Sequence, residues 1–311
     1  MQKKVFLTLL FSFFALKVRA LEFAEKRAVQ IEQLELFQKA YPDVRFHAVW
    51  DFCKKDYLVF VHFPSMPECE TVEFYWAGGR LLPEDKYDQK EKSSPILYFY
   101  PESLVDPAEM TAEQLGRLKE NALAESAENA LGSPMYFYDY LYDSFERKNL
   151  ESHIKEIPYL GLSMKIHERI EKNVRNVEKR IFEAAKTSSA VRKFLQELTI
   201  DAFFWRVIKG TERKSFHSLG IAIDVLPKNL HGKASYWAWT RDKIGDGWMF
   251  LPFSERWFPP REVIDAFEAE GFVWGGRWGI WDNMHFEYRP ELVLFNQKYN
   301  RTKKRACEAK K

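Results

Sequence analysis

The chain has few cysteines, and this limits the kinds of site it can build. Among its 311 residues there are three cysteines, Cys53, Cys69 and Cys307, and no Cys-x-x-Cys pair. A zinc site made of thiolates is therefore not indicated. Cys53 and Cys69 lie in a region that reads as β-rich, where a disulfide between them is possible in an exported protein. Cys307 would then be left without a partner.

Long apolar runs are also scarce, and the longest one lies at the N-terminus. Residues 1–20 begin with the basic stretch MQKK, continue with the apolar run VFLTLLFSFFAL and end in KVRA. This layout is typical of a secretory signal peptide, and the run is short for a membrane span. We expect an exported protein of the periplasm or cell envelope, with no stable membrane span once the signal is removed. An uncleaved N-terminal anchor is the alternative.

An excess of charge of either sign is missing as well. The full chain carries a net charge of +2, and without the four basic residues of the signal (Lys3, Lys4, Lys17 and Arg19) the net charge is −2. A nearly neutral body gives no footprint for nucleic acid, so none is expected as a partner. Nothing in the sequence indicates an oligomeric state.

The pattern of elements predicts an α+β fold. Apolar spacing predicts helices over 21–41, 111–131, 165–185 and 190–198, the second opened by a capping box of Thr111 and Gln114. Aromatic and β-branched runs predict strands over 44–50, 57–63, 71–77 and 95–100. We expect an N-terminal α+β region over 21–160, a second domain over 161–299 and a basic tail over 300–311. The tail is expected to be solvated and disordered, or to contact an anionic surface weakly.

Two short segments of the second domain carry side chains that suit a metal. SFHSLGIAIDVLPKN, residues 215–229, contains His217 and Asp224, and WDNMHFEYRP, residues 281–290, contains Asp282 and His285. A catalytic zinc site takes three protein ligands and leaves a position for water. A nearby carboxylate is then needed to accept a proton. His217, Asp224 and His285 can supply the ligands for one Zn²⁺, and Asp282 can be the base.

The spacing within both segments supports this assignment. GIAIDV alternates like a strand, with Asp224 on the face opposite Ile223 and Val225. MHFEY alternates too, which places His285 and Glu287 on one face. Two such strands side by side would present the ligands to a single point. A carboxylate on a buried strand is costly unless it is paired or bound to a metal, and a metal would account for it here.

Both segments resemble the signatures of the M15 family of zinc peptidases. SFHSLGIAID is similar to the family's Ser-x-His-x-x-Gly-x-Ala-x-Asp motif, and GFVWGGRWGIWDNMHFEY is similar to its second block, which ends in Asp-x-x-His-Phe-Glu. The resemblance covers about residues 160–296 and implies a small antiparallel sheet flanked by helices. It also implies that His217, Asp224 and His285 bind zinc while Asp282 is the general base. It also implies an arginine ahead of the first histidine, in WRVIKGTERKSFH. Arg206 is assigned there, with Arg213 as the alternative, either to stabilise the carbonyl oxygen or to hold a substrate carboxylate.

The family comprises D-alanyl-D-alanine carboxypeptidases and L-alanyl-D-glutamate endopeptidases. The resemblance therefore implies a zinc peptidase acting on peptidoglycan stem peptides, with the D-alanyl carboxypeptidase type expected and the endopeptidase type as the alternative. A non-catalytic, zinc-containing module that binds the cell wall is the alternative from another class. Between the two blocks, residues 243–272 are longer than in short family members, and we expect a loop over the cleft and a helix over 260–270. Of Trp248, Trp274, Trp278 and Trp281, most are expected in the core and one or two in the cleft.

Overall fold

The chain forms two compact units. The computed structural model describes residues 24, 26–127, 130–206 and 214–308, with side chains described as far as residue 300. One unit comprises Met1–Lys90 and the other Glu91–Lys311. The predicted signal peptide and Arg213 lie outside the described residues. The division at Lys90 differs from the expected boundary at residue 160, because residues 91–160 are built into the same unit as the second domain.

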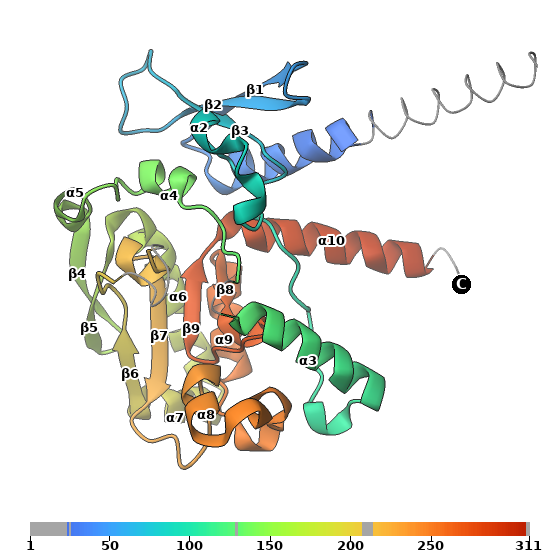
Figure 1. Ribbon diagram of the computed structural model, residues 1–311. Helices are drawn as coiled ribbons and strands as arrows, with labels where there is room; N and C mark the ends of the chain where they lie inside the picture. Colours follow the sequence, from blue (N-terminus) through green and yellow to red (C-terminus); the bar gives the residue numbers. More distant parts are fainter. Residues whose placement is uncertain (1–23, 25, 128–129, 207–213, 309–311) are drawn as a thin grey trace, which may run out of the picture. The chain divides into compact units, whose positions relative to one another are not determined.

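The first unit is a three-stranded antiparallel sheet with a helix over residues 26–40 (Figure 1). Its strands, in sheet order, are β1 (Arg45–Asp51), β2 (Asp56–His62) and β3 (Val72–Tyr75), and the short helix α2 (Glu84–Tyr87) follows. The fully buried ring of Phe37 lies 6.2 Å from the ring of Phe46 and 6.0 Å from that of Trp76. The first predicted helix and the first three predicted strands are confirmed.

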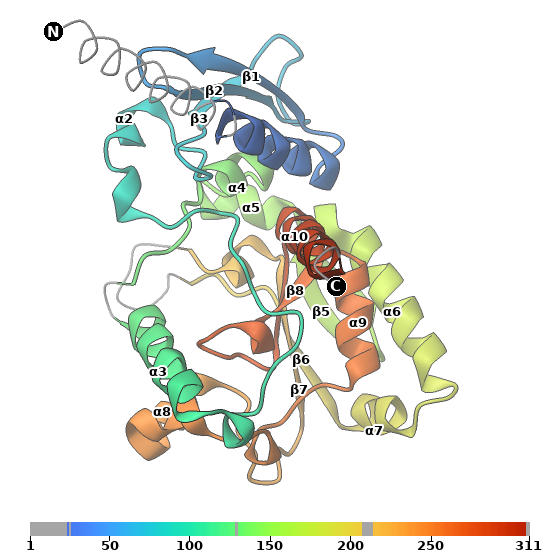
Figure 2. The same ribbon diagram turned by 90° about the vertical axis from the view of Figure 1, so that its right-hand side faces the viewer.

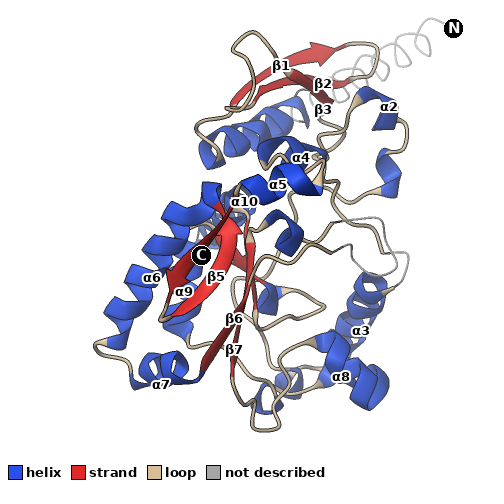
Figure 3. Ribbon diagram, turned by 90° about the vertical axis from the view of Figure 1, so that its left-hand side faces the viewer, coloured by secondary structure: helices blue, strands red, loops and turns tan. Residues whose placement is uncertain are grey.

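The second unit contains a four-stranded antiparallel sheet that carries the candidate site (Figures 1 and 3). Its strands, in sheet order, are β6 (Leu198–Asp201), β7 (Ala222–Pro227), β9 (His285–Tyr288) and β8 (Phe272–Trp274). A separate hairpin consists of β4 (Ile154–Tyr159) and β5 (Leu162–His167). β7 and β9 are neighbours in the sheet, as the alternating patterns required.

Helices flank this sheet, as predicted. α6 (Glu171–Ala185) and α9 (Arg261–Ala269) lie side by side in Figure 2, and α7 (Ser189–Glu197) follows α6. Phe267 of α9 stacks on Phe286 of β9 with ring centroids 4.0 Å apart. This apolar contact occupies one face of β9, so that His285 and Glu287 face the other way. The remaining helices are α3 (Ala112–Ser126), α4 (Tyr136–Leu141), α5 (Arg147–Ser152), α8 (Trp237–Ile244) and α10 (Pro290–Glu308).

Several predicted elements differ from the structure. The predicted strand over 95–100 does not form. Its backbone instead bonds to side chains: Asn296 of α10 accepts from the Tyr100 N–H and donates to the Tyr98 carbonyl. The start of the helix predicted over 165–185 is strand β5, since Ile166 is fully buried in the β4–β5 hairpin. The capping box of Thr111 and Gln114 is confirmed.

The C-terminal tail and the cysteines also differ from what the sequence predicted. Residues 300–308 continue helix α10, so the tail is not disordered over that stretch. Cys53 and Cys69 are both free and exposed, and the bridge between them is absent. None of the helices in the described part of the chain is long and apolar enough to cross a bilayer.

Burial of His167 predicts a loss of stability in acid. His167, at the end of β5, is 4% exposed; its Nδ1 accepts from the Arg169 N–H and its Nε2 donates to the Tyr142 carbonyl. Burial, together with the nearby His153, lowers its pKa from 6.5 to about 4. The unfolded state therefore takes up the proton first, and this contribution to stability is full above about pH 6.5 and declines as the pH falls towards about 4.

The test compares urea unfolding at about pH 7.5 and about pH 5. His167→Gln should lose about 2 kcal/mol less stability than the wild type over this interval, because it removes the titrating group. His231→Gln, at an exposed loop histidine, should lose as much as the wild type. Equal losses in all three proteins would contradict the prediction.

Candidate metal centre

His217 is held in a short turn just before strand β7. The 3-10 helix Phe216–Leu219 begins after Ser215, whose hydroxyl accepts from the His217 N–H. It ends at Gly220, with a positive φ of 67°. A Cβ there would lie 2.6 Å from Ile154 Cδ1 and 2.7 Å from the His167 nitrogen, so both conformation and space require glycine. The glycine lets the chain turn directly from His217 into β7.

The sheet register brings the other two residues together. Asp224 of β7 is the register partner of His285 of β9. On the other side of β7, Asp224 is the register partner of Asp201, which is exposed. The neighbours of Asp224 along the strand, Ile223 and Val225, are fully buried on the opposite face. The strand alternation thus places a carboxylate beside an imidazole from another part of the chain.

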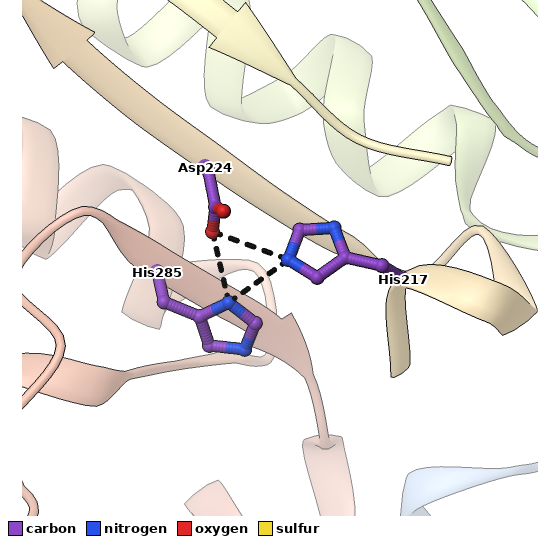
Figure 4. Close-up of side chains that lie close together, drawn as sticks. All are labelled: His217, Asp224 and His285. Carbon is purple, nitrogen blue, oxygen red and sulfur yellow. Dashed lines mark hydrogen bonds and ion pairs between the residues drawn. The ribbon is translucent and has the colours of Figure 1, made fainter. Parts of the chain in front are cut away.

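The three side chains meet at one point (Figure 4). Asp224 Oδ1 lies 3.2 Å from His217 Nε2 and 2.9 Å from His285 Nδ1, and the two nitrogens are 3.2 Å apart. His217 is 2% exposed and His285 is 8% exposed. One ligand atom from each of the three residues lies within 4.8 Å of the others, a separation that suits a single metal ion.

The outer nitrogen of each histidine has its own hydrogen-bond partner. His217 Nδ1 lies 2.6 Å from the Ala202 carbonyl oxygen, to which it donates. His285 Nε2 lies 3.3 Å from Glu287 Oε2, to which it donates. These bonds leave the lone pairs of His217 Nε2 and His285 Nδ1 directed at Asp224. Three electron-pair donors facing one another need a positive charge between them, so the donor set fits a divalent ion such as zinc.

The charge on Asp224 is stabilised within this cluster. Burial alone would raise the pKa of Asp224. In the metal-free protein the imidazoles of His217 and His285 outweigh burial, because a proton on either facing nitrogen is donated to the carboxylate, and they hold the pKa well below its ordinary value. Asp224 is therefore ionised, as a metal ligand must be.

Asp282 differs sharply from Asp224 in its surroundings. Its Oδ1 is buried and has no hydrogen-bond partner among the described residues. Burial and repulsion from Asp224 together raise the pKa of Asp282 to about 7, against the opposing effects of His285 and Arg206. The Asp282 carbonyl accepts from the His285 N–H at 3.3 Å, which fixes this residue beside the cluster. A carboxyl group with a pKa near neutrality suits proton transfer.

Arg206 lies next to the first histidine through its backbone. The Arg206 N–H donates to the Ser218 hydroxyl at 2.8 Å, and that hydroxyl donates to the Arg206 carbonyl. The side chain is exposed, and its charge acts on both Asp282 and Tyr236. The structure thus brings Arg206 to the edge of the cluster.

A buried ionic network behind His285 was not predicted. Glu287, which accepts from His285, is bound by Arg289 Nη1 at 3.2 Å, and Arg289 Nε donates to Glu291 at 2.5 Å. Arg289 Nη2 also donates to the Ile96 carbonyl, and the hydroxyl of Tyr138 donates to Glu291. The alternating charges of Glu287, Arg289 and Glu291 in the sequence could have indicated this network. The network fixes Glu287, and Glu287 fixes the imidazole of His285.

The four tryptophans predicted to divide between the core and the cleft are mostly buried. Trp248, Trp274 and Trp281 are buried, at 0%, 4% and 2% exposure. The Trp278 ring lies 5.5 Å from the His285 ring, and both Trp278 and Trp281 line a large cavity. The predicted helix over 260–270 is α9.

Comparison with protein families agrees with this geometry. Residues 209–288 match a peptidase M15 family described as D-alanyl-D-alanine carboxypeptidase. The match includes His217, Asp224, Asp282 and His285, and it supports an M15-type peptidase in the C-terminal part of the chain. Residues 33–98 match a family described as a domain of unknown function. No curated protein and no solved structure shows significant similarity to the chain.

Proposed function

We propose that the protein is an exported zinc peptidase that hydrolyses bonds in peptidoglycan stem peptides, as a D-alanyl carboxypeptidase. One observation carries the proposal: two buried histidines and a half-buried aspartate converge beside a buried carboxyl group that has a raised pKa and an unbonded oxygen. The first set fits a metal and the second fits a base. The M15 family match supports peptidase chemistry on cell-wall peptides.

The proposed roles follow from these positions. His217, Asp224 and His285 would hold Zn²⁺, which when bound polarises a carbonyl and acidifies water. Asp282 would accept a proton from the attacking water and deliver it to the leaving amine. Arg206 would stabilise the negative charge on the carbonyl oxygen or hold a substrate carboxylate, because its guanidinium remains charged. The apolar segment at residues 1–20 supports export to the periplasm or cell envelope.

The experiment is release of products from purified peptidoglycan by the zinc-loaded protein without residues 1–20, read by mass spectrometry. Loss of one terminal D-alanine from the stem is expected. Release of whole stem peptides would instead show an L-alanyl-D-glutamate endopeptidase, which the Asp-x-x-His spacing of Asp282 and His285 also suits. A protein that binds zinc and peptidoglycan yet releases nothing would be a binding module, and the proposal would be wrong.

A further inference from the structure

A cavity of about 810 Å³ lies within the second unit, next to the candidate metal centre. Its wall includes Trp278, whose ring lies near His285, and Glu287, which accepts a hydrogen bond from His285. Much of the remaining wall is apolar and comes from α3, the segment before it, and the long segment between the two motifs. A cavity of this size and composition is suited to a peptide segment or a small ligand.

The cationic side chains of this cavity are not equivalent. Lys214, Arg256, Arg277 and Arg289 all line it. Three of them pair with carboxylates: Lys214 with Asp139, Arg277 with Glu268, and Arg289 with Glu287 and Glu291. Arg256 has no carboxylate within ion-pair distance among the described residues. Another acid of the wall, Glu125, accepts from the Ile280 N–H.

The surroundings of Arg256 make the lack of a carboxylate partner unusual for an arginine. The residue is 6% exposed, and its guanidinium lies 4.4 Å from the centre of the Trp281 ring. Its Nε donates to the Leu251 carbonyl at 2.9 Å. Burial lowers the pKa of Arg256 to about 10, and the charge of Asp106 offsets this only in part. The Asp106 carboxylate is itself occupied by the backbone N–H groups of Ala108 and Phe253.

A buried guanidinium without a counter-ion is destabilising, so its presence in a cavity wall needs a compensating role. We propose that this cavity is a subsite for a carboxylate of the peptide substrate, with Arg256 as its ionic partner. The guanidinium fork can hold a carboxylate by two parallel hydrogen bonds. Trp281 supports the guanidinium and directly precedes Asp282, so the subsite adjoins the reacting groups. This inference rests on the proposed function, because it assigns the site a substrate with a free carboxylate.

The test measures peptide binding by calorimetry in the zinc-loaded Asp282→Asn protein, where hydrolysis should be too slow to interfere. The probes are acetyl-L-Ala-γ-D-Glu-L-Lys-D-Ala-D-Ala and two monoamides, one blocked at the C-terminal carboxylate and the other at the D-Glu carboxylate. Arg256→Met should weaken binding of the parent peptide about 10- to 100-fold, the range for a lost charge-assisted hydrogen bond. One of the two monoamides should bind the protein with Arg256 intact as weakly as the parent peptide binds the Arg256→Met variant. The affinity of this monoamide should not fall further on Arg256→Met. The carboxylate that is blocked in it is then the one that the subsite recognises.

Two further variants separate the role of charge from that of packing. Arg256→Lys should retain part of the affinity. Arg241→Met, at an exposed arginine that lies 4.8 Å from the centre of the Trp237 ring, should bind like the parent protein. Arg256→Met should melt at the same temperature or higher, since removal of an unpaired buried charge is not destabilising.

Three outcomes would overturn the subsite: an unchanged affinity in Arg256→Met, equal binding of both amides and the parent peptide, or no binding of any probe. Failure of the proposed function gives a different result. In that case the wild type releases nothing from peptidoglycan, while the dependence on Arg256 and one carboxylate persists.

Discussion

Replacement of Asp224 by alanine should remove zinc binding and peptide hydrolysis together. Asp224 Oδ1 is the atom that both His217 Nε2 and His285 Nδ1 face, so two neutral imidazoles would remain for a divalent ion. Changes to residues behind metal ligands already weaken binding about 10- to 100-fold, and loss of a charged ligand should exceed about 100-fold. Zinc content by mass spectrometry and affinity by competition with a chelator provide the measurement.

The register of the sheet offers a matched control for this prediction. Asp201 lies opposite Asp224 on the neighbouring strand and is exposed, so Asp201→Ala should bind zinc and cleave peptide like the wild type. Without zinc, Asp224→Ala should retain the circular dichroism spectrum of the wild type. Wild-type zinc affinity in a folded Asp224→Ala protein would show that the ion binds elsewhere.

Asp282→Asn should separate metal binding from catalysis. The amide keeps the size of the carboxyl group but cannot accept the proton, and general-base catalysis contributes about 10²- to 10⁴-fold to a rate. We therefore expect kcat to fall by that factor while zinc content stays the same. Hydrolysis of a synthetic stem peptide, followed with one equivalent of bound zinc, measures both quantities.

Asp242→Asn is the control, because Asp242 is exposed on α8 and lies outside the metal cluster. It should leave kcat unchanged. A decrease of less than tenfold in Asp282→Asn would contradict a role for Asp282 as the base, and a loss of zinc would show that its carboxylate supports the metal instead.

The convergence of the metal cluster could be predicted from the sequence because the information is local. Alternation around Asp224 and His285 indicated two strands with their polar side chains on one face, and the structure pairs these strands directly. The positive φ of Gly220, at the end of the turn that holds His217, is also a local feature. The short distance between Asp224 and His285 then follows from the sheet register, and the turn Phe216–Leu219 adds His217.

Features that depend on distant partners could not be predicted. The aromatic run at 95–100 resembles a strand, but its polar backbone groups are bound by Asn296, nearly two hundred residues away. Ile166 fitted the apolar stripe of a helix and lies instead in a strand, because the pairing of β4 and β5 overrides local periodicity. The unpaired state of Arg256 depends on where Asp106 makes its hydrogen bonds, which no local pattern encodes.

The buried ion network behind His285 also affects where along the chain the peptidase domain begins. Arg289 Nη2 is bound by the Ile96 carbonyl, and Glu291 is bound by Tyr138. Both partners precede residue 209, where the family match begins. A fragment cut at that residue would keep all three candidate metal ligands but leave part of a buried ion network unsatisfied, at a cost of several kcal/mol. The smallest self-sufficient peptidase domain is therefore longer than its recognisable signature, and residues before position 209 help to support the candidate metal site.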